Sequence, residues 1–263
     1  MDKTNYNEYI KIFWVGLMDG AGSIQVNHWE SKRLQYRLVI KLSNIKSNYN
    51  MLIKIAMVIG GTVIITNKGK DVIWVENKKE IVEEIIKIYD TYPPLTSKKI
   101  CQLAFFKRCL TGTSSFDSCR ATDRAKVSFL LNRNIKYDKQ LSIINQNLNF
   151  NLPCYFKSWL SGFIEAEGCF SSTKGYLSGI NNHTFSIGLN YDLYLLEAIK
   201  DYFESTIKII KPYPLYSCPD SGRAKGKLYL LVIYKKEIIL NIITHCTNYP
   251  LLGEKREALE KFN

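Results

Sequence analysis

The sequence predicts an α+β fold of two pseudo-symmetric αββαββα halves, each with a curved antiparallel sheet. The first observation is an internal repeat, because residues 13–24 recur as residues 158–170. The second is a later match in the same order, between residues 92–99 and residues 249–256. Two matches in register indicate a duplicated unit related by pseudo-twofold symmetry.

The repeat divides the chain into an N-terminal half, residues 1–111, and a C-terminal half, residues 151–263. Residues 112–150 repeat nothing in either half. They begin Gly-Thr-Ser-Ser and carry several Asn and Lys residues, a composition typical of a connection. We therefore interpret them as a linker that includes some helix around residues 127–131.

Alternating apolar and polar residues predict four strands in each half. Gly60, Gly61 and residues 68–71 separate the later strands of the first half. Apolar residues at helical spacing predict a helix at residues 51–56 and a counterpart at residues 195–199. The predicted strands are residues 23–29, 34–43, 61–67 and 71–76 in the first half, and residues 169–175, 182–190, 206–212 and 226–234 in the second.

The two repeated segments are predicted to be helices that pack against each other. Gly16 and Gly20 lie four residues apart, on one helix face, and Gly162 and Ala166 repeat this spacing. Small residues on one face let two helix backbones approach closely. We expect the glycine that ends each segment to allow a left-handed exit from the helix. The residue before that glycine then lies at the bottom of the pair, beside its twin.

Composition limits the class of protein and the kind of partner. The formal net charge is +12, which favours a polyanionic partner, although a solvated basic surface gives the same excess. No stretch has the roughly 18–20 apolar residues that a membrane span needs. The seven cysteines are scattered and never spaced as CxxC, which fits a reducing, intracellular compartment.

Residues 14–22 and 160–168 resemble the nine-residue signature of the LAGLIDADG homing endonucleases. The resemblance covers both halves, with the order of strands and helices intact. It implies two sheets that form a DNA-binding saddle in a monomer. It also implies binding of a long, asymmetric double-stranded DNA target and hydrolysis of its phosphodiester bonds. The chain is rich in Ile, Asn, Lys and Tyr, as in A/T-rich coding, so we expect an intron-encoded mitochondrial protein.

Position eight of the signature is the candidate metal site. In the family, acids there hold divalent metal ions, each beside the carbonyl group of position seven. Carried over, the second half supplies Glu167 and the Ala166 carbonyl, whereas the first supplies only the Gly20 carbonyl, because Ala21 has no carboxylate. The expected cofactor is Mg²⁺, which would position water and stabilise charge on the scissile phosphate. Ca²⁺ can occupy such a site without supporting cleavage.

Ala21 leaves three outcomes open: nicking of one strand, slow cutting of both strands, or binding without cleavage. Asp19 is no obvious substitute, because it lies two residues earlier, roughly 200° around the helix. Ala21 is either natural decay or a deliberate replacement of an acid. The rest of the first half shows no decay, which favours a deliberate replacement.

Three further residues are candidates for the catalytic site. Lys98 and Lys255 occupy equivalent places in the second repeated segment, after Tyr92-Pro93 and Tyr249-Pro250. In the family a basic residue near here lies beside the phosphate, although a surface lysine is an equal alternative. Asn44, just past the second strand, corresponds to a polar residue that orders water. Its counterpart lies near Leu189, which is apolar.

Polar strand faces are the candidate DNA-reading surface, because antiparallel ribbons fit the major groove and successive side chains alternate between faces. An ordinary half-exposed sheet with a polar outer face is the alternative. The candidates in the first half are Ser23, Gln25, Asn27, Trp29, Gln35, Arg37, Lys41, Thr66, Lys68 and Trp74. Those in the second half are Ser171, Thr173, Lys174, Ser186, Lys208, Arg223, Lys225, Lys227 and Tyr229.

Two other functions remain open at this stage. One is an RNA splicing maturase, whose basic surface would bind structured intron RNA and tolerate loss of cleavage. The other is a DNA-binding protein whose nuclease activity has been lost. Cleavage of target DNA in Mg²⁺ separates both from an active endonuclease.

Overall fold

The structure is a computed structural model. It describes residues 3–29, 33–111, 129, 131–148, 150–174, 181–211, 228–260 and 262. The N-terminal half contains a sheet of strand order β1-β2-β4-β3, with antiparallel neighbours throughout. Its elements are α1 (Lys3–Gly20), β1 (Gly22–Trp29), β2 (Arg33–Ser43), α2 (Lys46–Ile59), β3 (Thr62–Thr66), η1 (Asn67–Gly69), β4 (Asp71–Glu76), α3 (Lys79–Ile86), α4 (Ile88–Thr91) and α5 (Ser97–Thr111).

The C-terminal half repeats this order with a sheet of order β5-β6-β7 in the described residues. The short helix α8 (Gln140–Gln146) precedes it. Its elements are α9 (Phe156–Glu167), β5 (Gly168–Lys174), β6 (Asn181–Asn190), α10 (Leu193–Tyr202), β7 (Leu228–Ile233), α11 (Lys236–Asn248) and α12 (Glu254–Glu260). The predicted α+β fold of two similar halves is confirmed.

The strand predicted at residues 206–212 is wrong over the part that the structure describes. Ile210 makes an isolated bridge to Leu230, with N–H···O distances of 2.8 and 3.0 Å, and no longer ladder forms. Pro212 follows two residues later in the sequence and has no N–H to donate. A proline at this point disfavours continued pairing on the C-terminal side of Ile210.

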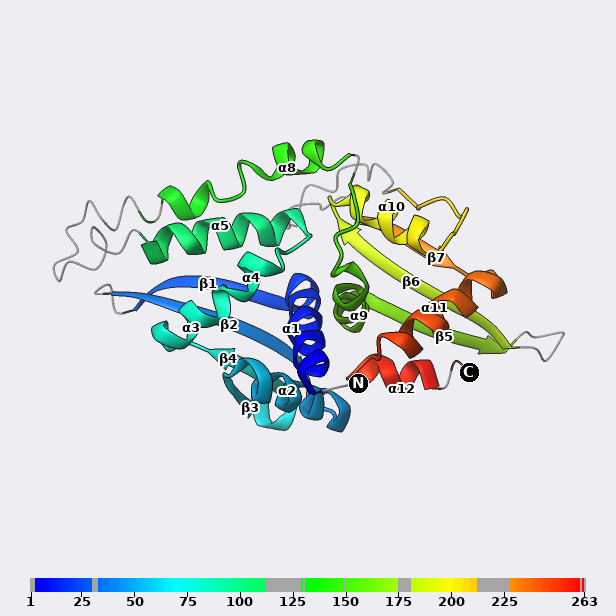
Figure 1. The fold of residues 1–263 in the computed structure, drawn as a ribbon, viewed down its shortest axis with the longest axis horizontal. Coiled ribbons are helices and arrows are strands. Elements are labelled where there is room, and N and C mark those ends of the chain that lie inside the picture. Colours follow the sequence, from blue (N-terminus) through cyan, green and yellow to red (C-terminus); the bar gives the residue numbers. More distant parts are fainter. Residues whose placement is uncertain are drawn as a thin grey trace.

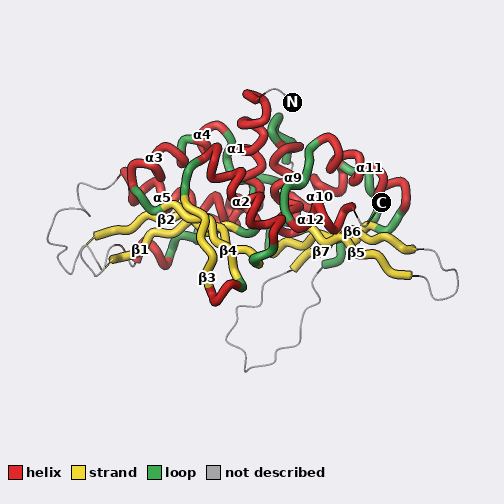
Figure 2. Tube along the Cα trace, turned by 90° about the horizontal axis from the view of Figure 1, so that it is seen from below, coloured by secondary structure: helices red, strands yellow, loops and turns green. Residues whose placement is uncertain are grey.

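The elements form two layers. Figure 2 shows the strands of both halves on one side of the molecule and the helices on the other. Between them lies the core, in which Trp14, Trp74 and Trp159 are fully buried. Trp14 and Trp74 pack edge to face with ring centroids 5.7 Å apart. Burial of each large apolar side chain contributes about 1.5–3 kcal/mol, so the sheets are fixed against the helices by their inner faces.

The described part of the linker packs along α5 (Figure 1). Phe129 contacts Phe105, with ring centroids 5.9 Å apart. Gln102 Nε2 donates to Tyr137 Oη at 2.9 Å. Residues 131–134 and α8 are helical, whereas residues 112–128 lie outside the described residues. In the described chain, no helix combines the length and apolar character needed to cross a membrane.

Candidate functional site

Helices α1 and α9 lie side by side at the centre of the molecule and bring the two signature segments together (Figure 1). A methyl group on Gly16 would overlap the Trp159 carbonyl oxygen and lie 2.9 Å from Phe163 N. A methyl group on Gly162 would overlap the Phe13 carbonyl oxygen in the same way. Neither position has room for a side chain, so the predicted close packing of the two helices is confirmed.

The lower ends of this helix pair bring Glu167 beside the end of α1. A methyl group on Gly20 would overlap the Ala166 side chain and lie 3.3 Å from Glu167 Oε1. Ala21 directly follows Gly20, and its N–H donates to the Leu17 carbonyl at 2.9 Å. The two position-eight residues are therefore brought to one place, where Glu167 supplies a carboxylate and Ala21 does not.

The glycines that end the two helices do not adopt the left-handed conformation that we expected. Gly168 has φ −72° and ψ 148°, and Gly22 does not have a positive φ either. Both positions instead need glycine for space. A methyl group on Gly22 would lie 2.7 Å from Met18 O, and one on Gly168 would lie 2.7 Å from Ile164 O. Close packing of the following strand against the helix, rather than handedness, explains these glycines.

The charges of lysines from both halves act on the Glu167 carboxylate. Partial burial raises the pKa of Glu167, and the charges of Lys99, Lys98 and Lys255 oppose this rise. Lys99 is buried, and its Nζ donates to the Gly22 carbonyl. Burial lowers the pKa of Lys99 to about 8. The charges of Lys98 and Lys255 thus both act on Glu167, as does the charge of Lys99, which sequence reasoning missed.

Asp19 serves the turn before α5. Its carboxylate accepts from Leu95 N, Thr96 Oγ1 and Trp159 Nε1, each at 2.7 Å. The first two bonds fix the turn that leads into α5, and the third reaches across to α9. Burial raises the pKa of Asp19 to about 6. Because its oxygens have these buried partners, Asp19 does not replace the acid missing at Ala21.

Glu165 plays the same part in the other half. Its carboxylate accepts from Leu252 N at 3.2 Å, from Gly253 N at 3.1 Å and from Lys255 N at 2.8 Å. Burial raises the pKa of Glu165, opposed by these backbone donors. Position six of each signature therefore binds the turn that leads into a helix of its own half. This helix is α5, with Lys98 and Lys99, in the first half and α12, with Lys255, in the second.

The side-chain amide of Asn44 is hydrogen-bonded to a turn. Its Nδ2 donates to the Gly69 carbonyl at 2.8 Å, and its backbone N–H donates to Lys70 O at 2.9 Å. These bonds tie the end of β2 to the turn between β3 and β4. The water-ordering role that we expected for Asn44 stays a prediction.

The outward face of the first sheet follows the predicted alternation. Ile24 and Val26 are buried, whereas Ser23, Gln25 and Asn27 are half-buried or exposed on the other face. Lys41 forms an ion pair with Asp71 across β2 and β4, at 2.8 Å. Further candidates that are exposed or half-buried are Gln35, Arg37, Thr66 and Lys68. The side chain of Trp29 lies outside the described residues.

The prediction that Trp74 reads DNA is wrong, because the side chain is fully buried. Its Nε1 donates to the Gly60 carbonyl at 2.8 Å. Val72 and Glu76 lie on the same inner face of β4, and Glu76 accepts from the two backbone N–H groups before α3. The outward side chains of strand β4 are instead Asp71, Ile73 and Val75.

The second sheet shows the same alternation. Ser171 and Thr173 are exposed, and Ser186 is half-buried on that face. Lys208 is exposed, opposite the buried Ile209. Tyr229 is a correction, because it lies on the inner side of β7 and packs against the core. Arg223, Lys225, Lys227 and the side chain of Lys174 lie outside the described residues.

The structure adds two cations to the edge of the first sheet. Arg133 and Lys136, from the linker, line a cleft of about 220 Å³ together with Ser23, Gln25 and Asn27 of β1. The described residues that line this cleft include no acid. The internal repeat does not indicate where the linker passes the first sheet. The sequence therefore did not predict that Arg133 and Lys136 lie beside β1.

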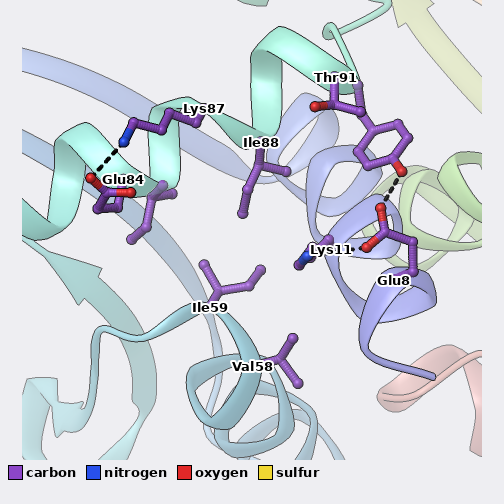
Figure 3. A pocket seen from close by; sticks show the side chains of 10 residues that line it. Glu8, Lys11, Val58, Ile59, Glu84, Lys87, Ile88 and Thr91 are labelled. Atoms are coloured by element: carbon purple, nitrogen blue, oxygen red, sulfur yellow. Dashed lines mark hydrogen bonds and ion pairs between the residues drawn. The ribbon is translucent and has the colours of Figure 1, made fainter. Parts of the chain in front are cut away.

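A second cleft, of about 370 Å³, lies among the helices α1 to α4 (Figure 3). Its charged side chains pair with one another: Lys11 with Glu8 at 3.1 Å, and Lys87 with Glu84 at 2.6 Å. Tyr92 also donates to Glu8. This cleft belongs to the helical side, so the candidate catalytic centre remains the base of the helix pair.

Comparison with known proteins agrees with this arrangement. The profile of the LAGLIDADG endonuclease family matches residues 14–109 and 160–263. A Debaryomyces hansenii protein named "Probable intron-encoded endonuclease aI3" is 45% identical over all of this chain, which spans 38% of that protein. A Dictyostelium citrinum protein of the same name is 40% identical, with 97% of this chain and 94% of that protein aligned.

Solved structures share the fold. The LAGLIDADG homing endonuclease I-GzeII in complex with a DNA target has a TM-score of 0.71 at 19% identity, covering 96% of this chain and 88% of that chain. The meganuclease I-CpaMI bound to uncleaved DNA has a TM-score of 0.69 at 18% identity, covering 96% and 89%. With two matched repeats that meet at a shared helix pair, this chain belongs to the LAGLIDADG endonuclease family.

Proposed function

We propose that this chain is a site-specific DNA endonuclease that hydrolyses phosphodiester bonds of a long, asymmetric duplex with a divalent metal, and that Ala21 impairs one of its two cleavage sites. The observation that carries the proposal is the place of Glu167, at the base of the helix pair, where the charges of three lysines act on its carboxylate. The family match and the names of the relatives support it.

The donor set at this place fits one Mg²⁺ site better than two. Gly20 and Ala166 lie in the last turns of their helices, where carbonyl groups have no partner within the helix. Together with the Glu167 carboxylate they offer a few hard oxygens, which suits Mg²⁺ when water and phosphate oxygens complete the shell. No group of three or more acidic, His or Cys ligands occurs among the described residues, so substrate oxygens are needed.

A divalent ion there would polarise the scissile phosphate and lower the pKa of an attacking water. The protein's own residues act around it. Glu167 anchors the site, and Lys98, Lys99 and Lys255 offset the negative charge that builds up on the phosphate. Lys99 is held by the Gly22 carbonyl, so its charge keeps a fixed position.

The polar sheet faces would track the two half-sites. Outward side chains such as Gln25 and Arg37 read base edges, and Arg133 and Lys136 contact phosphates beside β1. One chain supplies both halves, which supports action as a monomer. The names of the relatives and the A/T-rich residue usage support an intron-encoded, mitochondrial protein.

The test uses a target selected from a randomised DNA library and cloned into a supercoiled plasmid. We expect open circles in Mg²⁺, with linear product formed slowly, and no cleavage by Glu167→Gln, which keeps the size of the side chain but removes its charge. Specific binding without cleavage would leave a DNA-binding protein. Tighter binding of intron RNA than of every selected DNA would instead indicate a maturase.

A further inference from the structure

The turns that begin α5 and α12 are each held by a side chain from the opposite half. Asp192, which precedes α10 and is 2% exposed, accepts from Ser97 N through Oδ2 at 3.2 Å. Asn48, in α2 and 3% exposed, accepts from Glu254 N through Oδ1 at 3.0 Å. Ser97 is the first residue of α5 and Glu254 the first of α12, so the two contacts are reciprocal.

A tyrosine hydroxyl from the opposite half also binds each turn, at a carbonyl group that precedes the helix. Tyr194 Oη, from the second half, donates to Leu95 O at 2.6 Å. Tyr9 Oη, from the first half, donates to Pro250 O at 2.6 Å. Each turn is therefore tied to both halves, since Asp19 or Glu165 binds it from its own half.

The lysines that act on Glu167 follow directly. Lys98 and Lys99 come right after Ser97, and Lys255 comes right after Glu254. A backbone N–H group at the start of a helix has no partner within the helix, so a buried acceptor fixes where that first turn lies. Loss of the acceptor would displace the adjacent lysine without removing it.

We propose that Asn48 and Asp192 are positioning residues for the lysines of the opposite half: Asn48 for Lys255, and Asp192 for Lys98 and Lys99. The inference rests on the proposed nuclease function. Because each residue serves one of the two lysine-bearing turns, the two act on different sides of the shared centre. Each half thereby controls the placement of a charged group in the other.

The test measures cleavage of each target strand separately, with the two strands differently labelled, in the Ala21→Asp background. We expect Asn48→Leu to slow one strand about tenfold more than the other, and Asp192→Leu to show the opposite bias, since removing an outer-shell partner typically costs 10–100-fold. Asp192→Asn keeps an acceptor oxygen and is expected to restore the parent ratio. If Asn48→Leu does not fold, Asn48→Ser must show the same bias.

Glu76→Leu is the matched control, because Glu76 is a buried acceptor at the start of α3 that serves no lysine of this site. It should lower the unfolding temperature and leave the strand ratio unchanged. Equal slowing of both strands by the Asn48 and Asp192 variants, as for the control, would overturn this inference alone. Absence of any cleavage by the Ala21→Asp protein would overturn the proposed function, and this inference with it.

Discussion

At the scale of single residues, the same residue types serve either the catalytic centre or the scaffold according to their burial. Glu167 is exposed at the base of the helix pair, whereas Glu165, two residues earlier, is buried with backbone donors on both oxygens. A buried carboxylate with such partners is committed to the fold. Under the proposed function Glu167 would meet a metal and a phosphate, so the absence of a carboxylate at Ala21 would bear on chemistry rather than on stability.

His245 makes stability depend on pH. Tyr202 Oη lies 2.9 Å from its Nδ1, and Ser161 Oγ lies 3.2 Å from its Nε2 while donating to Tyr249 O at 2.7 Å. The Ser161 hydroxyl is thus committed as a donor, so Nε2–H donates to it and Nδ1 accepts from Tyr202. Burial lowers the pKa of His245 to about 4.

Because the pKa of His245 is lowered in the folded protein, the unfolded chain binds more protons than the folded chain at pH values below the ordinary histidine pKa of 6.5. The contribution of His245 is therefore complete above that pH and is lost as the pH falls toward 4. Between pH 7.5 and pH 5 we expect the parent to lose about 2 kcal/mol more than His245→Gln, measured by urea unfolding. An identical loss in both proteins would contradict the account of this network.

Residue positions were predictable from the sequence where a repeated motif fixed them and not where packing did. Glu167 follows from its place in the signature. The place of Lys99 does not follow from the motif. Lys98 and Lys99 are adjacent in α5, so their side chains point in different directions. Which of them is buried depends on the side of α5 that meets β1, and the sequence does not show this. Trp74 was misplaced because the alternation in β4 was continued with the wrong parity, and a shift of one residue exchanges the faces of a strand.

At the scale of elements, the helix pair sets the geometry of everything else. Gly16 and Gly162 let α1 and α9 touch through their backbones, and each helix continues into the first strand of its sheet. The distance between the two sheets therefore depends on these two residues. Sequence spacing was enough to predict this contact, because small residues four apart share a face.

Gly16→Ala tests that contact. The added methyl group meets backbone atoms of α9 that cannot rotate away, so we expect a loss of about 1–3 kcal/mol, which is typical of overpacked interiors. Thermal unfolding should report this as a fall of about 2–4 °C for each kcal/mol. Met57→Ala is the control, since Met57 is 80% exposed. A Gly16→Ala protein as stable as this control would refute the close packing.

Strand boundaries were the less predictable part of the elements. The strands of the first half agree with their predicted limits to within a residue, because glycines and turns mark their ends. Residues 206–211 carry an alternating pattern as well, yet they make only one bridge. An alternating segment needs a partner strand of matching length, and a single sequence does not show that partner.

At the scale of the whole molecule, the two halves are alike in order and different in detail. The first sheet has four strands and the second has three in the described residues, and their outward side chains differ. Such a pair suits a target whose two half-sites differ. The shared centre is unequal as well, with a carboxylate at Glu167 and none at Ala21, and under the proposed function we expect the two strands of a target to be cut unequally.

The most direct test restores the missing acid. Parent protein and Ala21→Asp are incubated with target plasmid and Mg²⁺, and the rate at which linear DNA forms is followed on a gel. Under the proposed function a second carboxylate beside Glu167 would complete a second metal site, so we expect Ala21→Asp to form linear DNA at least about tenfold faster. Unchanged nicking, or no cleavage, after this replacement would contradict the account of a shared centre crippled at Ala21.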